Sequence, residues 1–567
     1  MYCKKCNLQI ESDTCPVCGA PTEEKVPAEI FWCDNCFSPV TVPLSAENKN
    51  ICPLCFGKMR KLAADIRPVF PEERLLLAAL LDKPPDFFMN RSLWASDSRY
   101  YIDGKGLAVP AKKFAEADTD SICKKISVSS AVISYDRFQS DICKFVRANR
   151  YRLDFLKEEA DSFVQQTAKN FPEERVVISF SGGKDSAVVA DIVVRALNNP
   201  SLVHIFGNTT LEFPTTLAYV ARYRKNHPFA IFQSAINDEQ NFFDVCKDIG
   251  PPARMLRWCC SMFKTGPIAR VIGSLYRDKK ILTFYGIRKS ESAARSKYNR
   301  VEGDADSIKI RRQTVASPIF FWKDADIWLY IFSEGIDFNE AYRLGYDRVG
   351  CWCCPNNNQR AQFLSRIYMP NESKKWRTFL VDFAKKIGKS DPEVYVDSGK
   401  WKARQGGNGL ISANDVKIQF TNCTAEEHAK IYRLSRPFDD KFIGLFVPFG
   451  KIAPELGRKI LHETLIIDYK TNVPILSITP FNHGDAVKIK TLNVADHESL
   501  QRMASYQVRK FNACRKCLKC ESICHAGAIS VGEKYFIDPS KCVHCKMCVT
   551  TKYLDGGCMM EKFLRTK

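Results

Sequence analysis

The sequence predicts an α/β protein in which a parallel sheet is flanked by small cysteine-rich modules. Between residues 170 and 370, apolar segments with strand character alternate with helical patterns, as in "RVVISFS" followed by "AVVADIVVRAL". Such alternation is typical of a parallel sheet with both faces covered by helices. A turn rich in glycine and serine follows the first of these strands, and all but four of the 25 cysteines fall in pairs or short runs.

The bulk sequence indicates where the protein resides. The chain has 567 residues, enough for several domains. It contains no apolar run of about eighteen residues, and its start, "MYCKKCNLQI", lacks the apolar region of an export signal. We therefore predict a cytoplasmic protein with no membrane contact. In a reducing cytosol, clustered cysteines are read as metal ligands rather than as disulfides.

Residues 1–60 contain eight cysteines in four Cys-x-x-Cys pairs, accompanied by turn-forming residues, as in "CPVCGA" and "CPLCFGK". One such turn directs two thiolates at one ion, and two turns complete a tetrahedron. Pairing the turns in sequence order predicts two zinc ribbons, whose four thiolates per ion leave no open position and indicate structural sites. A segment this short buries little apolar surface and needs such sites to fold. The predicted zinc ligands are Cys3, Cys6, Cys15, Cys18, Cys33, Cys36, Cys52 and Cys55.

The rest of the chain divides by composition. Residues 61–150 predict a mixed α/β connecting region, and residues 151–384 contain the alternating strands and helices. Residues 385–429 are rich in Lys, Gly, Asp and Asn and predict a linker or surface insertion. Residues 430–499 contain strand-like segments such as "VPILSITPF" and predict a small β-rich domain, and residues 500–567 form a second cysteine-rich module.

The turn in "SFSGGKDS" has the features of a phosphate-binding loop. Its glycines let the backbone approach a phosphate closely, and the N-terminus of the following helix directs N–H groups and its positive end at it. Lys184 adds a cation, and Asp185 is placed to cap the helix or to hold a magnesium ion. The spacing differs from the G-x-x-x-x-G-K-S/T loop.

This loop and three later stretches resemble the ATP pyrophosphatase (PP-loop) and phosphoadenylylsulfate (PAPS) reductase superfamily. The later stretches are "GNTTLEFPTTLAYV", "YGIRKSESAARS" and "SPIFFWKDADIWLYI", and the four matches occur in order over residues 170–370. The resemblance implies a parallel sheet of the adenine-nucleotide α-hydrolase-like fold. It implies nucleotide contacts for Ser181, Gly182, Gly183, Lys184, Asp185, Ser186, Arg288, Ser292 and Arg295, with Lys184, Asp185 and Arg288 in catalytic roles. Independently of the family, guanidinium groups suit phosphate and sulfate oxygens.

Two cysteine groups lie inside the nucleotide domain, in "RWCCSMFK" and "GCWCCPNN". Two adjacent cysteines plus a Cys-x-x-Cys pair can supply four thiolates to zinc or to a four-iron cluster. The adjacent pair resembles the cluster site of adenylylsulfate reductases and of the PAPS-reductase-like subunit of DNA phosphorothioation systems. That resemblance implies a 4Fe-4S cluster on Cys259, Cys260, Cys351 and Cys354, with Cys260 also in catalysis. Cys353 is left over as an alternative ligand, a persulfide carrier or a packed thiol.

The C-terminal module has the cysteine spacing of bacterial-type ferredoxins, C-x-x-C-x-x-C-x-x-x-C, followed by a second set with a longer last gap. In two-cluster ferredoxins the fourth cysteine of each run binds the other cluster. The predicted 4Fe-4S ligand sets are therefore Cys514, Cys517, Cys520 and Cys558, and Cys542, Cys545, Cys548 and Cys524. His525 stands where proline usually follows the run, and Cys558 is further out than usual.

The metal sites change the charge balance. The formal net charge is +20, but a zinc ion or an oxidised four-iron cluster with four thiolates carries about −2. Two zinc sites and three clusters would leave about +10, which permits binding to nucleic acid or to an acidic partner protein, and equally a basic solvated surface.

These features predict an enzyme of sulfur metabolism. The first hypothesis is ATP-dependent adenylation, with magnesium, and sulfur transfer to a nucleic-acid acceptor, tRNA or DNA, with a cysteine desulfurase as a sulfur source. The alternative is reduction of a sulfated adenine nucleotide (PAPS or APS) to sulfite with an electron donor protein, and the third is a non-catalytic nucleotide-binding scaffold. The complete loop and the absence of the reductases' Glu-Cys-Gly-Leu-His tail favour the first, whereas the ferredoxin module favours the second.

Overall fold

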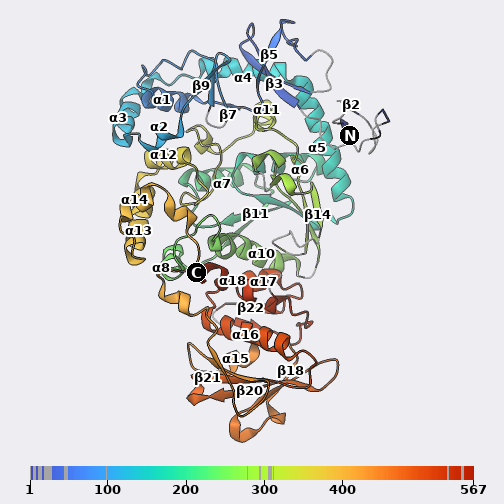
Figure 1. Cartoon of the computed structure of the whole chain (residues 1–567). Helices are drawn as coiled ribbons and strands as arrows, with labels where there is room; N and C mark the ends of the chain where they lie inside the picture. Colours follow the sequence, from blue (N-terminus) through green and yellow to red (C-terminus); the bar gives the residue numbers. More distant parts are fainter. Residues whose placement is uncertain are drawn as a thin grey trace.

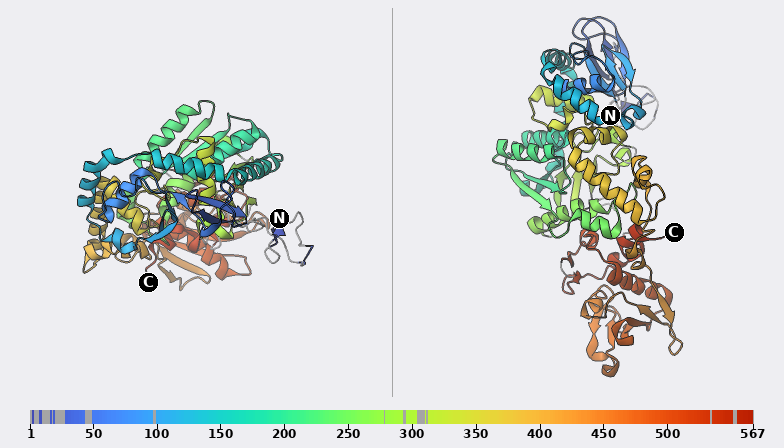
Figure 2. Two further views of the ribbon diagram at one scale, coloured as in Figure 1. Left: turned by 90° about the horizontal axis from the view of Figure 1, so that it is seen from above. Right: turned by 90° about the vertical axis from the view of Figure 1, so that its left-hand side faces the viewer.

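The computed structural model describes residues 2–3, 8–9, 16–17, 19, 28–43, 49–96, 99–277, 279–292, 295–303, 310, 312–532, 535–550 and 554–566. The side chains of the first predicted zinc set, Cys3, Cys6, Cys15 and Cys18, lie outside this description. The molecule is elongated, with the N-terminal modules at one end, the parallel sheet in the middle and a second β-sheet at the other end (Figures 1 and 2). No helix of the described residues is long and apolar enough to cross a membrane.

The N-terminal end contains a two-stranded antiparallel sheet of β1 (Tyr2–Cys3) and β2 (Leu8–Gln9) and two larger antiparallel sheets. Strands β3 (Ala28–Cys33), β4 (Ser38–Pro43) and β5 (Met59–Ala63) form the second predicted zinc ribbon, in the order β4-β3-β5. Strands β6 (Arg67–Pro68), β7 (Leu93–Ser96), β8 (Arg99–Ile102) and β9 (Lys105–Ala108) form the next sheet. The ribbon is fixed to the helical layer by Asn149, whose Oδ1 accepts a hydrogen bond from the backbone N–H of Thr41 at 2.6 Å.

The central sheet confirms the predicted α/β fold with a parallel core. Its order is β12-β11-β10-β13-β15-β14, and all neighbours are parallel except the edge strand β14. The strands are β10 (Val176–Phe180), β11 (Val203–Asn208), β12 (Ile231–Ile236), β13 (Ile281–Phe284), β14 (Val301–Gly303) and β15 (Gln313–Ala316).

Helices cover both faces of this sheet because its strands are apolar on both sides. Val176, Ile178 and Phe180 pack with helices α5 (Arg150–Ala168), α6 (Lys184–Leu197), α7 (Pro214–Asn226) and α11 (Asp324–Glu334). Val177 faces the opposite side and packs with α10 (Gly266–Tyr276). The alternation within one strand therefore divides the core into two layers.

Residues 385–429, predicted as a linker or surface insertion, pack against the nucleotide domain. They follow α12 (Gln359–Tyr368) and α13 (Pro370–Lys386) and include α14 (Pro392–Asp397) and short 3-10 turns at Lys400–Ala403 and Ile411–Asn414. Trp401, Leu410 and Val416 are buried in one apolar cluster with Trp376 of α13. The polar composition of this segment concealed the few large side chains that anchor it.

The C-terminal half contains a six-stranded antiparallel sheet in the order β16-β17-β21-β20-β19-β18. The strands are β16 (Phe420–Asn422), β17 (Ala429–Arg433), β18 (Lys451–Ala453), β19 (Thr464–Ile467), β20 (Pro474–Phe481) and β21 (Ala486–Thr491). The sheet thus begins at Phe420, before residue 430 where the β-rich domain was expected.

The second cysteine-rich module lies between this sheet and the nucleotide domain (Figure 1). It contains α16 (His497–Ala513), α17 (Lys519–Ile523), the strands β22 (Ile529–Val531) and β23 (Tyr535–Ile537), and α18 (Met559–Leu564). Residues of the sheet such as Ile478 and of the module such as Val508 share one apolar core. The predicted β-rich domain and the second cysteine-rich module therefore share one core and pack as a single unit.

Candidate functional site

The predicted phosphate loop joins β10 to α6 in a conformation that glycine permits. Gly182 has φ +72°, and a Cβ at this position would lie 2.8 Å from Thr216 Cγ2. Ser186 Oγ accepts a hydrogen bond from the backbone N–H of Ser181 at 3.1 Å and donates one to the carbonyl of Gly183 at 2.8 Å. The loop is therefore tightly held at the N-terminus of α6, where an anion is favoured.

Two cations and two carboxylates meet directly behind the loop. Lys184 Nζ lies 3.2 Å from Asp185 Oδ2 and 3.0 Å from Asp324 Oδ1. Arg288 donates from Nε to Asp185 Oδ1 at 2.5 Å and from Nη2 to Asp324 Oδ1 at 2.8 Å. Lys184 and Arg288 are only 2% and 5% exposed, so this quartet of side chains is a buried, paired arrangement.

The pairing fixes the ionisation of the quartet. Burial alone would raise the pKa of Asp185, but Arg288 and Lys184 outweigh it and hold that pKa far below its usual value. Burial would lower the pKa of Lys184, and the carboxylates of Asp185 and Asp324 raise it instead. Lys184, Asp185 and Arg288 are therefore all charged at neutral pH.

The second predicted contact region, around Ser292 and Arg295, lies near this quartet. Ser292 Oγ accepts a hydrogen bond from the backbone N–H of Arg295 at 3.2 Å, and Arg295 forms an ion pair with Glu291. Burial and the nearby cation of Arg348 lower the pKa of Arg295 to about 10. The positive charges of Arg288 and Arg348 therefore both act on the guanidinium group of Arg295.

Several residues of this site were not assigned a role from the sequence. Tyr342 accepts a hydrogen bond at its hydroxyl from the backbone N–H of Lys184 at 3.0 Å, and Asn339 donates to the Gly182 carbonyl at 3.2 Å. Asp324 stands in the stretch "KDADIW", whose position beside the loop is set only by the fold. Nothing in the local sequence of Tyr342 or Asn339 marks them as partners of a loop about 160 residues earlier.

The structure brings the inner cysteines together. Cys259 and Cys260 end the short helix α9 (Trp258–Cys260), which continues into the π-helical turn η3 (Ser261–Thr265) and then α10. A hydrogen bond with Cys260 and burial raise the pKa of the Cys259 thiol, with smaller effects from the thiols of Cys351 and Cys353. Burial raises the pKa of the Cys354 thiol, to which Cys260 also contributes. The five cysteines of the two groups are thus neighbours.

One segment connects the inner cysteines to the phosphate loop. It follows β11 and begins at Thr209, whose Oγ1 lies 3.4 Å from Cys351 Sγ. It ends at Thr216, whose Oγ1 accepts a hydrogen bond from Asn339 at 2.9 Å beside Gly182. Both sites therefore lie at the carboxyl ends of adjacent parallel strands, the edge where ligands bind in such sheets.

The cysteines of the second ribbon have zinc-site geometry. Cys33 Sγ lies 3.5 Å from Cys55 Sγ, and Cys36 Sγ lies 3.8 Å from Cys52 Sγ. Four thiolates at about 2.3 Å from one zinc ion are about 3.8 Å apart. Among the described residues, this is the one group with at least three potential ligand atoms within 4.8 Å of one another. The donor set therefore fits zinc.

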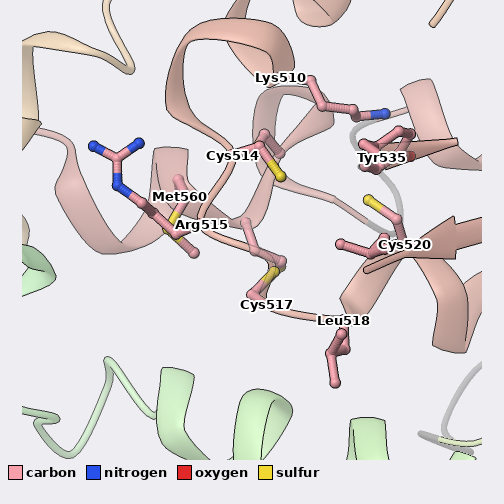
Figure 3. Close-up of a pocket in the computed structure, with 11 residues that line it drawn as sticks. Lys510, Cys514, Arg515, Cys517, Leu518, Cys520, Tyr535 and Met560 are labelled. Atoms are coloured by element: carbon pink, nitrogen blue, oxygen red, sulfur yellow. The ribbon is translucent and has the colours of Figure 1, made fainter. Parts of the chain in front are cut away.

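The C-terminal cysteines gather in the two predicted sets. Thiol groups of Cys514, Cys517, Cys520 and Cys558 line a common cavity together with Lys510 and Tyr535 (Figure 3). Burial, with Cys514 and Cys520, raises the pKa of Cys558 to about 12. In the second set, burial raises the pKa of Cys542, with contributions from Cys524 and Cys545.

Among the described residues, the thiols of the C-terminal sets are spaced more widely than those of the second ribbon, since neither set has three ligand atoms within 4.8 Å of one another. Lys510 lies between the sets and is 1% exposed. Its Nζ donates a hydrogen bond to the carbonyl of Cys548 at 2.9 Å. Burial would lower the pKa of Lys510, but the thiols of Cys520 and Cys548 keep it above its usual value. A buried cation suits a site that accumulates negative charge.

The C-terminal module packs against the domain that contains the inner cysteines. Cys517 and Cys558 belong to the same apolar cluster as Cys353, and Cys259 and Cys351 pack against that cluster. Arg270 of α10 donates to both carboxylate oxygens of Glu521 at 2.9 and 3.2 Å. The two predicted cluster regions are therefore joined by packed side chains.

The central domain is similar to domains of known proteins. Residues 175–357 match the family model of the phosphoadenosine phosphosulfate reductase domain. An adenosine 5'-phosphosulfate reductase of Staphylococcus epidermidis is 24% identical over 231 residues, which cover 39% of this chain and 85% of the reductase. These matches support the expected superfamily of PAPS reductases and ATP pyrophosphatases for this reductase-like domain.

Two uncharacterized relatives extend further along the chain. An uncharacterized protein of Methanocaldococcus jannaschii is 30% identical over 298 residues, 53% of this chain. This chain spans 58% of that relative and 60% of a second one from the same organism. A PAPS reductase structure from Candida auris covers 36% of this chain and 95% of its own, with 18% identity and a TM-score of 0.28.

Proposed function

We propose that this protein is an iron–sulfur oxidoreductase that binds a sulfated adenine nucleotide and reduces it to sulfite. Electrons would enter through the C-terminal module from a low-potential electron donor protein. The observation that carries this proposal is the apolar cluster in which Cys517 and Cys558 pack with Cys353, beside Cys259 and Cys351. Reduction of the nucleotide needs electrons at a site beside the phosphate loop, whereas adenylation needs none.

The chain's own residues would bind and orient the nucleotide. The backbone of Gly182 and Gly183 and the N-terminus of α6 would face the phosphate. Lys184 and Arg288 would neutralise it, and Arg295 would contact the sulfate end. Because the segment from Thr209 to Thr216 runs from Cys351 to the phosphate loop, the sulfur atom of the substrate would lie toward the inner cysteines.

The donor sets match the groups that such a reaction needs. Iron–sulfur clusters bound at Cys259, Cys260, Cys351 and Cys354 and at the two C-terminal sets would supply one-electron transfer. Reduction consumes two electrons: the bond between sulfur and the phosphate oxygen breaks, sulfate-level sulfur becomes sulfite, and the nucleotide leaves with that oxygen. Direct electron supply would replace the catalytic cysteine of the reductase tail, which this sequence lacks.

A second candidate is ATP-dependent adenylation and sulfur transfer to tRNA or DNA. The complete loop, with Lys184 and Asp185 both present and ion-paired at 3.2 Å, favours it. In that case magnesium would accompany ATP, pyrophosphate would leave, and a cysteine desulfurase would supply sulfur. The structure offers this reaction no evident use for two further cysteine sets, so we rank it second.

The test is to measure products under anaerobic conditions with a low-potential one-electron donor. We expect sulfite and the nucleotide 5'-phosphate in equal amounts from APS or PAPS, and no product in Cys260→Ser protein. Cys143→Ser is the matched control, because Cys143 is an exposed cysteine outside every cluster. Pyrophosphate release from ATP without sulfite formation from either sulfated nucleotide would overturn the assignment in favour of sulfur transfer.

A further inference from the structure

The second zinc ribbon reaches the nucleotide site through one carboxylate. Asp65 lies two residues beyond β5, the strand that pairs Met59 with the metal-ligand candidate Cys33. Its side chain is half-buried at the junction between the ribbon and the reductase-like domain. Its carboxylate contacts the first turn of α11.

Asp65 caps a helix that belongs to another domain. Its Oδ2 accepts a hydrogen bond from the backbone N–H of Asp324 at 2.8 Å, and its Oδ1 accepts one from Ala325 at 3.1 Å. The residue at the N-cap position of α11 is Lys323, and a lysine side chain has no acceptor for these N–H groups. Asp65 therefore provides the oxygens that a helix start requires.

A second contact fixes the same junction. Lys323 Nζ donates to the carbonyl of Ala64 at 2.7 Å, so both sides of the junction exchange hydrogen bonds. The residue capped in this way, Asp324, is the carboxylate that holds Lys184 and Arg288 at 3.0 and 2.8 Å. The chain of contacts from ribbon to phosphate loop thus consists of Asp65, Asp324 and the two cations.

We propose that Asp65 is a positioning residue for the nucleotide site, and that the zinc ribbon thereby forms part of that site. This inference rests on the proposed role of Lys184 and Arg288 in binding the nucleotide's phosphate. Without the oxygens of Asp65, the first turn of α11 loses its cap and Asp324 loses its fixed place. Lys184 and Arg288 are then no longer held in a common geometry for a phosphate.

The charge of Asp65 adds a property that a purely structural cap would lack. The groups facing it are Asp324 and Lys323 at the start of α11, and Arg288. Burial and Asp324 raise the pKa of Asp65 to about 6. Above that pH, Asp65 carries a negative charge close to Arg288, one of the cations that would bind the phosphate; below it, Asp65 is neutral. Phosphate binding should therefore tighten as the pH falls through about 6.

The experiment compares Asp65→Ala, Asp65→Asn and wild-type protein, using binding of APS at pH of about 5.5 and 8. We expect Asp65→Ala to bind roughly fivefold more weakly, the effect of losing a typical cap. Asp65→Asn keeps an acceptor oxygen without the charge, so it should bind at least as tightly as wild type at the higher pH. Its affinity should also lose the part of the pH dependence that comes from Asp65.

The matched control is Asp34→Ala, which removes an exposed ribbon carboxylate paired with Arg60 at 3.2 Å, away from α11. It should leave APS affinity and its pH profile unchanged. Equal affinity in Asp65→Ala and wild type, or an unchanged pH profile in Asp65→Asn, would overturn the inference while leaving the proposed function standing. Wild-type protein that binds no sulfated nucleotide at all would overturn both. If Asp65→Ala fails to fold, the pH profile of Asp65→Asn still decides.

Discussion

Leu518 occupies the space in which a side chain on Gly266 would begin: a Cβ on Gly266 would lie 2.6 Å from Leu518 Cβ. Gly266 opens α10, six residues after Cys260, and Leu518 stands between Cys517 and Cys520. The C-terminal module therefore touches the reductase-like domain where both carry candidate cluster ligands. This contact needs the absence of a side chain at position 266.

The first prediction concerns this contact. Gly266→Ala should push Leu518 and the π-helical turn apart and slow reductive turnover by about tenfold, while APS affinity stays within about twofold. Gly273→Ala, on the same helix, is the control, because a Cβ there meets nothing within 4 Å. Stopped-flow reduction of the inner site and nucleotide binding are the measurements. Equal turnover in both variants would show that electrons do not pass this contact.

The second prediction concerns Lys510. Lys510→Met removes a buried cation from between the two C-terminal cysteine sets, so adding an electron becomes less favourable and the reduction potentials should become more negative. A redox titration followed by electron paramagnetic resonance measures this shift. Lys562→Met, which changes an exposed lysine of α18, should leave both potentials in place. Unchanged potentials in Lys510→Met would contradict the proposed electrostatic role.

The third prediction concerns the phosphate loop. Gly182→Ala forces a Cβ to within 2.8 Å of Thr216 Cγ2 at a φ of +72°. Nucleotide affinity should fall by about tenfold, and the free energy of unfolding by about 1–2 kcal/mol. Calorimetric binding and denaturant unfolding separate the two effects. Gly444→Ala, where a Cβ meets nothing within 4 Å, is the control for added bulk; undiminished affinity in Gly182→Ala would argue against this loop as the nucleotide site.

The fourth prediction separates the inner cysteines. Three four-iron clusters amount to about twelve irons per chain. Cys354→Ala should lose about four of them, whereas Cys353→Ala should retain all, because Cys353 is 3% exposed within an apolar cluster and lies outside the predicted ligand set. Iron analysis after anaerobic reconstitution is the measurement. The opposite pattern would exchange the roles of the two residues.

The last prediction uses the exposed end of the second C-terminal set. Cys545 is exposed, whereas Cys548 is buried. Cys545→Ser should leave APS affinity unchanged and stop sulfite formation from the physiological donor, since it removes a ligand of the outer set. Turnover at the wild-type rate would make that set structural.

The sequence could predict those features whose signal is local. The loop at Ser181–Ser186 is contiguous, and the C-terminal cysteine sets follow from spacing, so the members of each group could be proposed from the sequence. Asp65 and Asp324, by contrast, are 259 residues apart and meet only because the ribbon packs on α11. Lys510 stands in an ordinary amphipathic helix, and its burial between cysteines depends on how α16 docks. Trp401 lies in a polar segment, and its burial likewise depends on how that segment packs on α13.

The placement of cysteines inside apolar cores has a consequence for how the protein is made. Cys520 and Cys548 are buried in the core that contains Phe442 and Ile478, and Cys517 shares another with Trp376. Under the proposed cluster assignment, iron would have to reach these thiols while the chain is still open. A cell short of iron would hold open, apolar-exposed chains subject to proteolysis rather than a reserve of empty enzyme, and the abundance of the protein would follow the iron supply.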